Sequence, residues 1–240
     1  MDISIKAMIL AAGRGDRLRP LTDRMPKCMV PIGGKPLLEH TIEWLAQCGV
    51  TDVIINLFHL PHVVMDHFQD GHRWGIRIEY SIEDHPLGTA GGVRNAAWFF
   101  DGPFFLWYGD NLSRCDLKRL NLFHRNKGGS ASIALYQRDD VSQSGIVGID
   151  GDDRIVGFLE KPRSDQVFSN LVNAGIYLLD PRIFDWIPKE GASDFALDVF
   201  PAMLANGQAM YGYRLSQKEE LWWIDRPEDL ANLSKRWKTE

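Results

Sequence analysis

The sequence is poor in cysteine, and its three cysteines lie far apart, at Cys28, Cys48 and Cys115. That number and spacing exclude a disulfide framework and the paired ligands of a zinc site. We interpret all three as small buried hydrophobic residues. The chain of 240 residues is 45% hydrophobic and 25% charged, which excludes a disordered or collagen-like protein and is typical of a folded globular one.

Long apolar runs are also absent. The longest, at 7–12 and 104–108, are far shorter than the roughly 20 residues that a membrane-spanning helix needs. Residues 1–6 include Asp2 and lack the basic start and apolar stretch of a signal peptide. These features predict a cytoplasmic protein that does not associate with membranes.

The sequence has no excess of positive charge that would attract nucleic acid. It contains 27 Lys and Arg against 32 Asp and Glu, a net charge of −5. Residues 1–35 nevertheless carry seven basic and three acidic groups, or +4, which leaves −9 for the remainder. A solvated basic loop is the simplest interpretation of such a cluster, and only the motifs around it argue for anion binding.

No linker rich in Pro, Gly or Ser divides the chain, so we predict a single domain over residues 1–240. In the first half, apolar strands alternate with amphipathic helices, which predicts an α/β protein with a doubly wound, mostly parallel, Rossmann-like sheet. The second half is richer in strands with short spacings, which favours antiparallel pairing. The expected strands are 6–13, 50–57, 76–81, 104–110, 130–136, 145–150, 154–161 and 171–180, and the expected helices are 35–49, 61–68, 90–99, 195–205 and 227–236.

A glycine-rich basic loop, residues 10–40, follows the first expected strand. In an open α/β sheet, ligands bind at the carboxyl ends of the strands, where this loop begins. Gly13 and Gly15 allow a phosphate to approach the backbone, and the surrounding Arg and Lys residues supply charge for a polyphosphate. A Rossmann fingerprint requires Gly or Ala where Leu18 stands, and a P-loop requires Ser or Thr where Pro36 stands, so both are disfavoured.

The whole loop resembles the signature of sugar-1-phosphate nucleotidylyltransferases, whose first strand leads into Gly-x-Gly-x-Arg-Leu, Pro-Leu-Thr and Pro-Lys. The matching positions are Gly13, Gly15, Arg17, Leu18, Pro20, Leu21, Thr22, Pro26 and Lys27. Asp16 departs from the Thr or Ser usual in that family. The resemblance implies a nucleotidyltransferase fold of the GT-A type, in which Arg17 and Lys27 hold nucleotide phosphates. It also implies that the backbone of Leu10, Ala11, Ala12, Gly13 and Gly15 contacts the nucleotide.

Further motifs follow in the family's order. Residues 81–96 resemble the base-reading loop of the mannose-1-phosphate and manno-heptose-1-phosphate guanylyltransferases, which implies that the nucleobase lies against Glu83, Pro86, Gly88 and Thr89. By itself this stretch could equally be a glycine-rich helix start. The resemblance also implies a magnesium cofactor held by two carboxylates. These are Asp110, after the strand at 104–110, and Asp225, in a Trp-x-Asp pattern where Arg226 replaces a small residue.

The sugar side of the pattern lies in the second half. By the resemblance, Lys161 pairs with the sugar phosphate, and further contacts come from Asn111, Gly145, Glu160, Asn173 and Gly175. Ser144 stands where the family usually has Tyr, which implies an altered wall of the sugar pocket. The resemblance thus divides the chain into a nucleotide-binding half, about 1–112, and a sugar-phosphate-binding half, about 113–240.

The implied reaction transfers a nucleoside monophosphate from GTP to mannose or manno-heptose 1-phosphate and releases pyrophosphate. UTP, CTP or dTTP with another sugar 1-phosphate stays an alternative, as does a catalytically silent regulatory subunit that binds nucleotide sugars. The sequence is also compatible with a homodimer. The histidines between residues 59 and 85 fit no metal-binding motif. The sequence contains no Gly-x-Ser-x-Gly motif of a serine hydrolase. The scattered tryptophans are interpreted as core residues, with Trp222 and Trp223 near the site.

Overall fold

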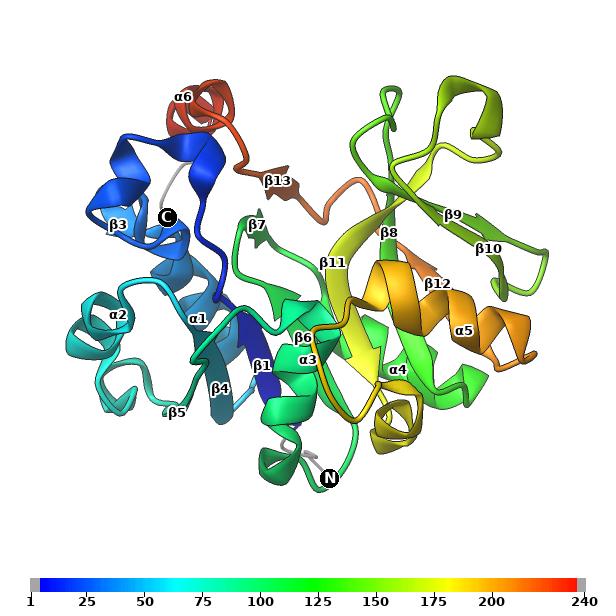
Figure 1. The fold of residues 1–240 in the computed structure, drawn as a ribbon, viewed down its shortest axis with the longest axis horizontal. Helices are drawn as coiled ribbons and strands as arrows, with labels where there is room; N and C mark the ends of the chain where they lie inside the picture. Colours follow the sequence, from blue (N-terminus) through cyan, green and yellow to red (C-terminus); the bar gives the residue numbers. More distant parts are fainter. Residues whose placement is uncertain (1–4, 237–240) are drawn as a thin grey trace. The chain divides into compact units, whose positions relative to one another are not determined.

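The computed structural model describes residues 5–236 of the chain, and side chains for residues 5–233. It forms two compact units (Figure 1). Unit 1 contains the residues up to Pro86, Trp107–Cys115 and the segment from Glu219, whereas unit 2 contains Leu87–Leu106 and Asp116–Lys218. Each unit therefore combines segments that are distant in sequence. The prediction of one domain, divided functionally near residue 112, stays a prediction.

Unit 1 is built on parallel strands connected by helices. Its elements are β1 (Ala7–Leu10), β2 (Pro31–Ile32), β3 (Lys35–Pro36), α1 (Leu37–Gln47), β4 (Asp52–Leu57), α2 (Pro61–Phe68), β5 (Arg77–Ile82), the end of β6 (Phe104–Tyr108), β7 (Asn111–Ser113), β13 (Leu221–Trp223) and α6 (Pro227–Arg236). Strand β4 pairs in parallel with both β1 and β5 (Figure 1). Helices α1 and α2 make the crossovers that such parallel pairing requires. The predicted α/β architecture is confirmed.

The strand order creates a topological switch point in unit 1. From β1 the chain proceeds to β4 and then β5, whereas β6 neighbours β1 on its other side. The backbone N–H of Gly109, just after β6, donates to the carbonyl of Leu10 at the end of β1, at 2.9 Å. Ligands of open α/β sheets bind outside the carboxyl ends of strands at such a point. The fold thus places the glycine-rich loop and Asp110 side by side there.

Helix α1 buries the face that its sequence period predicts. Leu37, Leu38, Ile42 and Leu45 are fully buried, and Thr41 is nearly so. Each large aliphatic side chain contributes about 1.5–3 kcal/mol when buried. The helix starts after Pro36 and ends before Gly49, whose φ of 91° is suited to glycine. The face of α1 therefore fixes the loop that precedes it to the body of unit 1.

Unit 2 contains the remaining strands and helices. They are α3 (Gly88–Asn95), α4 (Leu117–Lys127), β8 (Ala131–Gln137), β9 (Gly145–Ile149), β10 (Ile155–Glu160), β11 (Leu171–Leu179), a π-helical turn (Phe195–Val199), α5 (Phe200–Ala205) and β12 (Met210–Arg214). As predicted, β9 pairs antiparallel with β10, and β11 pairs antiparallel with β8 and β9. Strand β12, which is not among the expected strands, pairs with β8 in parallel.

Several local predictions differ from the structure. The expected helix at 90–99 is α3 followed by a 3₁₀ turn at Ala97–Phe99, and the expected helix at 195–205 begins as a π-helical turn. The interpretation of the tryptophans as core residues is wrong for most of those described. Trp107 is fully buried, but Trp98 is 67% exposed and the others are partly exposed. Cys28 and Cys115 are buried as expected, whereas Cys48 is half-buried.

Candidate active site

The glycine-rich loop is a series of short 3₁₀ turns, at Asp16–Leu18, Leu21–Asp23 and Lys27–Met29. Gly15 precedes the first turn with a φ of 68°, in the left-handed region that favours glycine. A Cβ at Gly15 would lie 2.9 Å from the Cβ of Lys27 and 2.9 Å from Cγ2 of Thr22. At Gly13, by contrast, a Cβ would meet no atom within 4 Å. Gly15 thus closes the loop onto Lys27, and Gly13 lies on its exposed side.

Lys27 connects the two carboxylates that the sequence analysis singled out. Its Nζ lies 2.9 Å from Oδ2 of Asp110 and 2.7 Å from Oδ1 of Asp225. Only 9% of Lys27 is exposed. Burial alone would lower the pKa of its ammonium, but the attraction of the two carboxylates outweighs this effect and raises the pKa. Lys27 therefore stays charged and holds together carboxylates that are 115 residues apart in sequence.

Arg17 adds a second positive charge to this cluster. Its Nη2 lies 2.9 Å from the same Oδ1 of Asp225, and 61% of its side chain is exposed. Asp16, the residue that departs from the family signature, pairs instead with Arg19, at 2.8 Å. The negative charge of Asp16 is therefore neutralised by Arg19, within the same loop. Arg17, Lys27, Asp110 and Asp225, hereafter the carboxylate–lysine cluster, all belong to unit 1.

A short two-stranded ladder brings Asp225 to Asp110. Strand β13 pairs antiparallel with β7, with Trp223 opposite Asn111. Beyond the ladder, the N–H of Ile224 donates to the carbonyl of Asp110, at 3.2 Å. The buried side chain of Ile224 joins a hydrophobic cluster that fixes the C-terminal segment against the loop, formed by Leu18, Val30, Ile32, Leu37, Leu112, Ile224 and Leu233. Asn111, the first residue of β7 in this ladder, is fully buried.

The turn after Asp225 is held by a carboxylate that the sequence analysis gave no role. Oδ2 of Asp229 accepts hydrogen bonds from the backbone N–H groups of Asp225 and Arg226, at 3.0 and 2.8 Å. Asp229 lies in the first turn of α6, a position where acidic side chains stabilise a helix. The side chain of Arg226 itself is exposed. The departure at Arg226 is therefore accommodated by a contact made through its backbone alone.

Asp110 also has an oxygen without a hydrogen-bond partner among the described residues. Its Oδ1 is buried and accepts no hydrogen bond, while Oδ2 faces Lys27. An unpaired buried carboxylate oxygen is costly unless a cation or donor completes it. The described residues contain no group of three or more His, Cys, Asp or Glu side chains that could hold a metal. Mg²⁺ is commonly bound by only one or two carboxylates together with substrate phosphates and water, so this pair fits it.

A buried polar pair in unit 1 includes Glu83, which the sequence analysis predicts to contact the nucleobase. Glu83, 5% exposed, accepts at Oε1 a hydrogen bond from Nδ2 of Asn56, at 2.7 Å. Oδ1 of Asn56 accepts from the N–H of Ala11, at 2.8 Å. Leu10, Ala11 and Glu83 are thus connected through a residue that the sequence analysis missed. Because Asn56 lies within an otherwise apolar strand, the only signal for it is an amide at the strand's carboxyl end. Ala12 is half-buried and Pro86 exposed.

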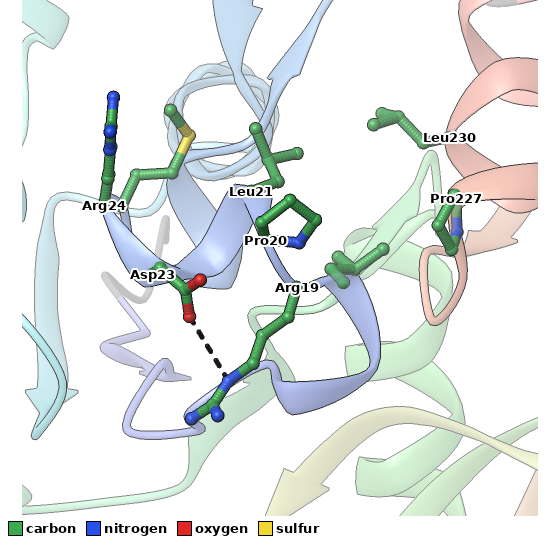
Figure 2. A pocket seen from close by; sticks show the side chains of 9 residues that line it. Arg19, Pro20, Leu21, Asp23, Arg24, Pro227 and Leu230 are labelled. Carbon is green, nitrogen blue, oxygen red and sulfur yellow. Dashed lines mark ion pairs between the residues drawn. The ribbon is translucent and has the colours of Figure 1, made fainter.

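An apolar cavity of about 630 Å³ lies beside the loop (Figure 2). It is lined by Leu18, Arg19, Pro20, Leu21, Asp23, Arg24, Met25, Pro227 and Leu230. Figure 2 shows the ion pair of Arg19 with Asp23 along this surface. None of the predicted site residues lines the cavity. We therefore assign it no part in the chemistry of the carboxylate–lysine cluster.

The glycine run of the expected base-reading loop begins α3 in unit 2. A Cβ at Gly88 would lie 2.4 Å from the carbonyl oxygen of Ser193, so only glycine fits there. The hydroxyl of Thr89 donates to Oδ1 of Asp194 at 2.9 Å, and the N–H groups of Ala90 and Gly91 donate to the carbonyl of Ser193. Amides at this helix start therefore already have partners within unit 2. A contact of Gly88 and Thr89 with a nucleobase stays a prediction.

Apart from Asn111, which lies in unit 1, the predicted sugar-side residues gather at two places in unit 2. Gly145 and Glu160 face each other across the β9–β10 pair, where a Cβ on Gly145 would lie 2.7 Å from Oε2 of Glu160. Lys161 follows with a φ of 47°, unusual for a residue other than glycine, and its N–H donates to the carbonyl of Ser144 at 3.1 Å. Such strained backbone is often found at functional sites.

The second group lies on β11. Oδ1 of Asn173 accepts from the N–H of Gly175 at 2.9 Å, and its Nδ2 donates to the hydroxyl of Tyr177 at 2.7 Å. Gly175 has a φ of 65° and interrupts the regular pairing of β11 with β8 between Asn173 and Tyr177. A bulge of this kind re-aims side chains at the edge of a site. The structure thus explains why Gly175 and Asn173 occur together, and sugar contact stays a prediction.

The environment of the Glu160 carboxyl can be tested by the dependence of protein stability on pH, without an activity assay. Burial raises the pKa of its carboxyl, the charge of Lys161 lowers it and that of Asp194 raises it again, with a net rise. Because the folded-state pKa is raised, the contribution of Glu160 to stability is full below the pKa of the unfolded chain and is lost as pH rises through the folded-state pKa. Replacing Glu160 by Gln should therefore increase the Tm relative to wild type progressively as the pH rises above about 4.3, the ordinary pKa of a Glu side chain.

Thermal unfolding of both proteins at a series of pH values from this pKa upward measures this difference. Glu190→Gln is the matched control, because Glu190 is an exposed residue of the same unit. Its Tm difference from wild type should not change in this way. A Glu160→Gln difference that is constant with pH, or that falls as pH rises, would contradict the assigned cause.

Among residues 5–236, none of the helices combines the length and the apolarity needed to cross a bilayer. Burial raises the pKa of the Cys28 thiol to about 12. A thiol with so high a pKa is a poor nucleophile at neutral pH. Cys28 is therefore a buried packing residue.

Curated proteins of known name are similar to this chain over most of its length. The chain is 38% identical over 234 residues to a mannose-1-phosphate guanylyltransferase of Mycobacterium tuberculosis, covering 95% of this chain and 63% of the relative. It is 36% identical over 235 residues to a UTP–glucose-1-phosphate uridylyltransferase of Synechocystis, covering 92% and 60%. The chain thus spans about three fifths of the length of these relatives.

Solved structures share the fold over the full chain. The crystal structure of HddC from Yersinia pseudotuberculosis matches with a TM-score of 0.82 and 27% identity, covering 98% of this chain and all of HddC. The complex of HddC with GMP-PN matches with a TM-score of 0.81. This likeness confirms the predicted fold class.

The family assignment rests on most of the sequence. The family model described as "Nucleotidyl transferase" matches residues 6–237, from the first strand to beyond α6. This range includes the glycine-rich loop, both carboxylates of the cluster and the predicted sugar-side residues. The resemblance found from the motifs is thereby confirmed, and the chain belongs to the nucleotidyl transferase family.

Proposed function

We propose that the chain transfers a nucleoside monophosphate from a nucleoside triphosphate to a sugar 1-phosphate, giving a nucleoside diphosphate sugar and pyrophosphate. The lead substrates are GTP and mannose or manno-heptose 1-phosphate. The observation that carries the proposal is the carboxylate–lysine cluster, in which Lys27 Nζ lies within 2.9 Å of an oxygen of Asp110 and of Asp225. It lies at the switch point of unit 1, where α/β proteins bind ligands.

The proposed reaction needs no side-chain nucleophile. A sugar 1-phosphate is already ionised at neutral pH, so its own oxygen attacks the α-phosphorus while the bond to the β-phosphate oxygen breaks. The protein's task is to position the phosphates and to neutralise charge. Arg17 and Lys27 neutralise the triphosphate, and Lys161 holds the attacking phosphate against like-charge repulsion. Glu160, Asn173 and Gly175 bind sugar hydroxyls.

Asp110 and Asp225 are the proposed ligands of Mg²⁺. When bound, the metal supplies positive charge to the triphosphate oxygens. In this account the two carboxylates have two functions, because they also hold Lys27 in its buried position. The unpartnered Oδ1 of Asp110 supports the assignment. The nucleotide, the sugar 1-phosphate and this metal are the only ligands that the proposal requires, and a homodimer stays a prediction.

Guanine is the proposed base. The relative from M. tuberculosis is named a guanylyltransferase, and HddC was crystallised with GMP-PN. UTP with glucose 1-phosphate is the second candidate, favoured by the similarity to the Synechocystis uridylyltransferase. A catalytically silent regulatory subunit is disfavoured, because Lys27, Asp110, Lys161 and Asp225 are all present in the chain.

A matrix of pyrophosphate-release assays with Mg²⁺ tests the function. GTP, UTP, CTP, dTTP and ATP are each combined with mannose, glucose and manno-heptose 1-phosphates. We expect the highest kcat/KM for GTP with a manno-configured sugar and no release when the sugar phosphate is omitted. Preferential release with UTP and glucose 1-phosphate would establish the second candidate. Silence with every pair, by a folded protein that binds nucleotide sugars, would favour the regulatory subunit.

A further inference from the structure

The buried amide of Asn56 has no role in the proposed reaction so far. The side chain is 2% exposed at the carboxyl end of β4. In the parallel pairing, Asn56 lies opposite Leu10 of β1 and Ser81 of β5. It therefore lies at the middle of three strand ends. On one side is the segment from Leu10, whose backbone is expected to contact the nucleotide, and on the other is Glu83, which is expected to contact the base. A buried amide in an otherwise apolar strand needs partners for both its ends.

The partners of Asn56 determine which way its amide points. The backbone N–H of Ala11 can only donate, so the atom of Asn56 that lies 2.8 Å from it is the acceptor Oδ1. The amide nitrogen must then face the other partner, and Nδ2 lies 2.7 Å from Oε1 of Glu83. If Oδ1 and Nδ2 of Asn56 exchanged places, a donor would face the N–H of Ala11 and an acceptor would face the carboxylate of Glu83, so neither hydrogen bond could form. The backbone at the end of β1 thus dictates that Asn56 donates to Glu83.

Because Nδ2 of Asn56 donates to Oε1 of Glu83, the carboxylate of Glu83 acts as a hydrogen-bond acceptor. The N–H of Glu83 is fixed separately, because it donates to the carbonyl of Leu57 at 2.8 Å. With backbone and Oε1 both held, the carboxylate has one orientation. Guanine offers adjacent donors on its pairing edge, the ring N–H and the 2-amino group, and a fixed acceptor suits them. Adenine offers a ring acceptor at the corresponding position, and hypoxanthine lacks the 2-amino group.

We propose that Asn56 is a positioning residue for nucleobase selection, which holds the carboxylate of Glu83 in the orientation that accepts the 2-amino group of a guanine nucleotide. This inference rests on the proposed function in taking GTP as the lead nucleotide, and on the prediction that Glu83 contacts the base. Asn56 does not touch the nucleotide itself. The hydrogen bond from Ala11 fixes the amide of Asn56, and the amide in turn fixes the carboxylate of Glu83, the residue proposed to select the base.

Binding of GTP and ITP by isothermal titration calorimetry tests the proposal, because these nucleotides differ only in the 2-amino group. Wild type should bind GTP about 10- to 100-fold more tightly than ITP. Asn56→Ala and Asn56→Asp should reduce that ratio about 10-fold or more. Inorganic tripolyphosphate, which has no base, should bind all three proteins equally. Asn206→Ala is the matched control, because Asn206 is an exposed amide outside both strands, in unit 2, and its ratio should equal that of wild type.

The double variant Asn56→Asp with Glu83→Gln adds a test that does not depend on the single variants folding. The reversed pair restores a hydrogen bond between the two side chains, so the Tm should recover. The GTP-to-ITP ratio should recover only in part, because a neutral amide oxygen then replaces the carboxylate oxygen as the acceptor. The proposal is overturned if wild type does not distinguish GTP from ITP, if the variants keep the wild-type ratio, or if GTP and tripolyphosphate weaken together. Absence of nucleotidyl transfer would overturn the proposed function without changing these binding ratios.

Discussion

Asp110→Asn and Asp225→Asn should each lower kcat/KM for the proposed transfer by at least about 10³-fold. Each substitution removes one negative charge while keeping the size of the side chain. Two effects combine: a proposed ligand of Mg²⁺ becomes neutral, and Lys27 loses one of the two carboxylates that hold its Nζ within 2.9 Å. Initial rates of pyrophosphate release at saturating Mg²⁺ measure the effect.

A separate measurement distinguishes catalysis from folding. Mn²⁺ binding in the presence of nucleotide, followed by electron paramagnetic resonance, should weaken in both variants even where the Tm stays near that of wild type. Asp66→Asn is the matched control, because Asp66 is an exposed residue of α2 in the same unit. It should leave both activity and metal binding unchanged. Full turnover by either cluster variant would contradict the assignment of these carboxylates.

Gly15→Ala should reduce activity about 10²-fold, because a displacement of about 1 Å near reacting groups has an effect of that size. The added methyl group would lie 2.9 Å from the Cβ of Lys27, so the lysine must shift. Alanine at a φ of 68° is also strained. Steady-state kinetics with the preferred nucleotide, together with the Tm, measures the two effects separately.

The variant Gly75→Ala is the control that separates the effect of a steric clash with Lys27 from the effect of backbone strain. Gly75 has a similar φ, 72°, but a Cβ there would meet no atom within 4 Å. This control should lose a similar amount of stability from strain and keep its activity. Equal activity of Gly15→Ala and Gly75→Ala would show that the approach of Gly15 to Lys27 has no importance for the reaction.

Much of unit 1 could be predicted from the sequence, because its signals are local or belong to a known pattern. The apolar period of α1 identifies its buried face, and the glycine-rich loop identifies Arg17 and Lys27. Asp110 could be placed because an acid after a buried strand lies at the ligand-binding edge of the sheet. Asp225 was found only through the family pattern, since the β7–β13 ladder that brings it to Asp110 has strands of three residues each.

Other features depend on tertiary contacts that leave little trace in the sequence. Helix α4 was not predicted, although Asp116 accepts hydrogen bonds from Lys118 and Arg119 at its start and Gly128 ends it. Those capping residues are a signal that could have been used. Strand β12 contains Gly212, which weakens the strand pattern. The contact of Lys27 with both carboxylates and the contact of Asn56 with Glu83 each join segments far apart in the chain, so no local pattern reveals them.

The central claim is that, at the carboxylate–lysine cluster, a phosphate oxygen of a sugar 1-phosphate forms the new bond to the α-phosphorus of GTP and pyrophosphate leaves. Mannose 1-phosphate labelled with ¹⁸O at every non-bridging phosphate oxygen tests it most directly, with products analysed by mass spectrometry. The account predicts that the nucleotide sugar retains all of the label, including the oxygen between its two phosphates, and that pyrophosphate contains none. Label in the released pyrophosphate, or formation of GMP or GDP in place of a nucleotide sugar, would contradict it.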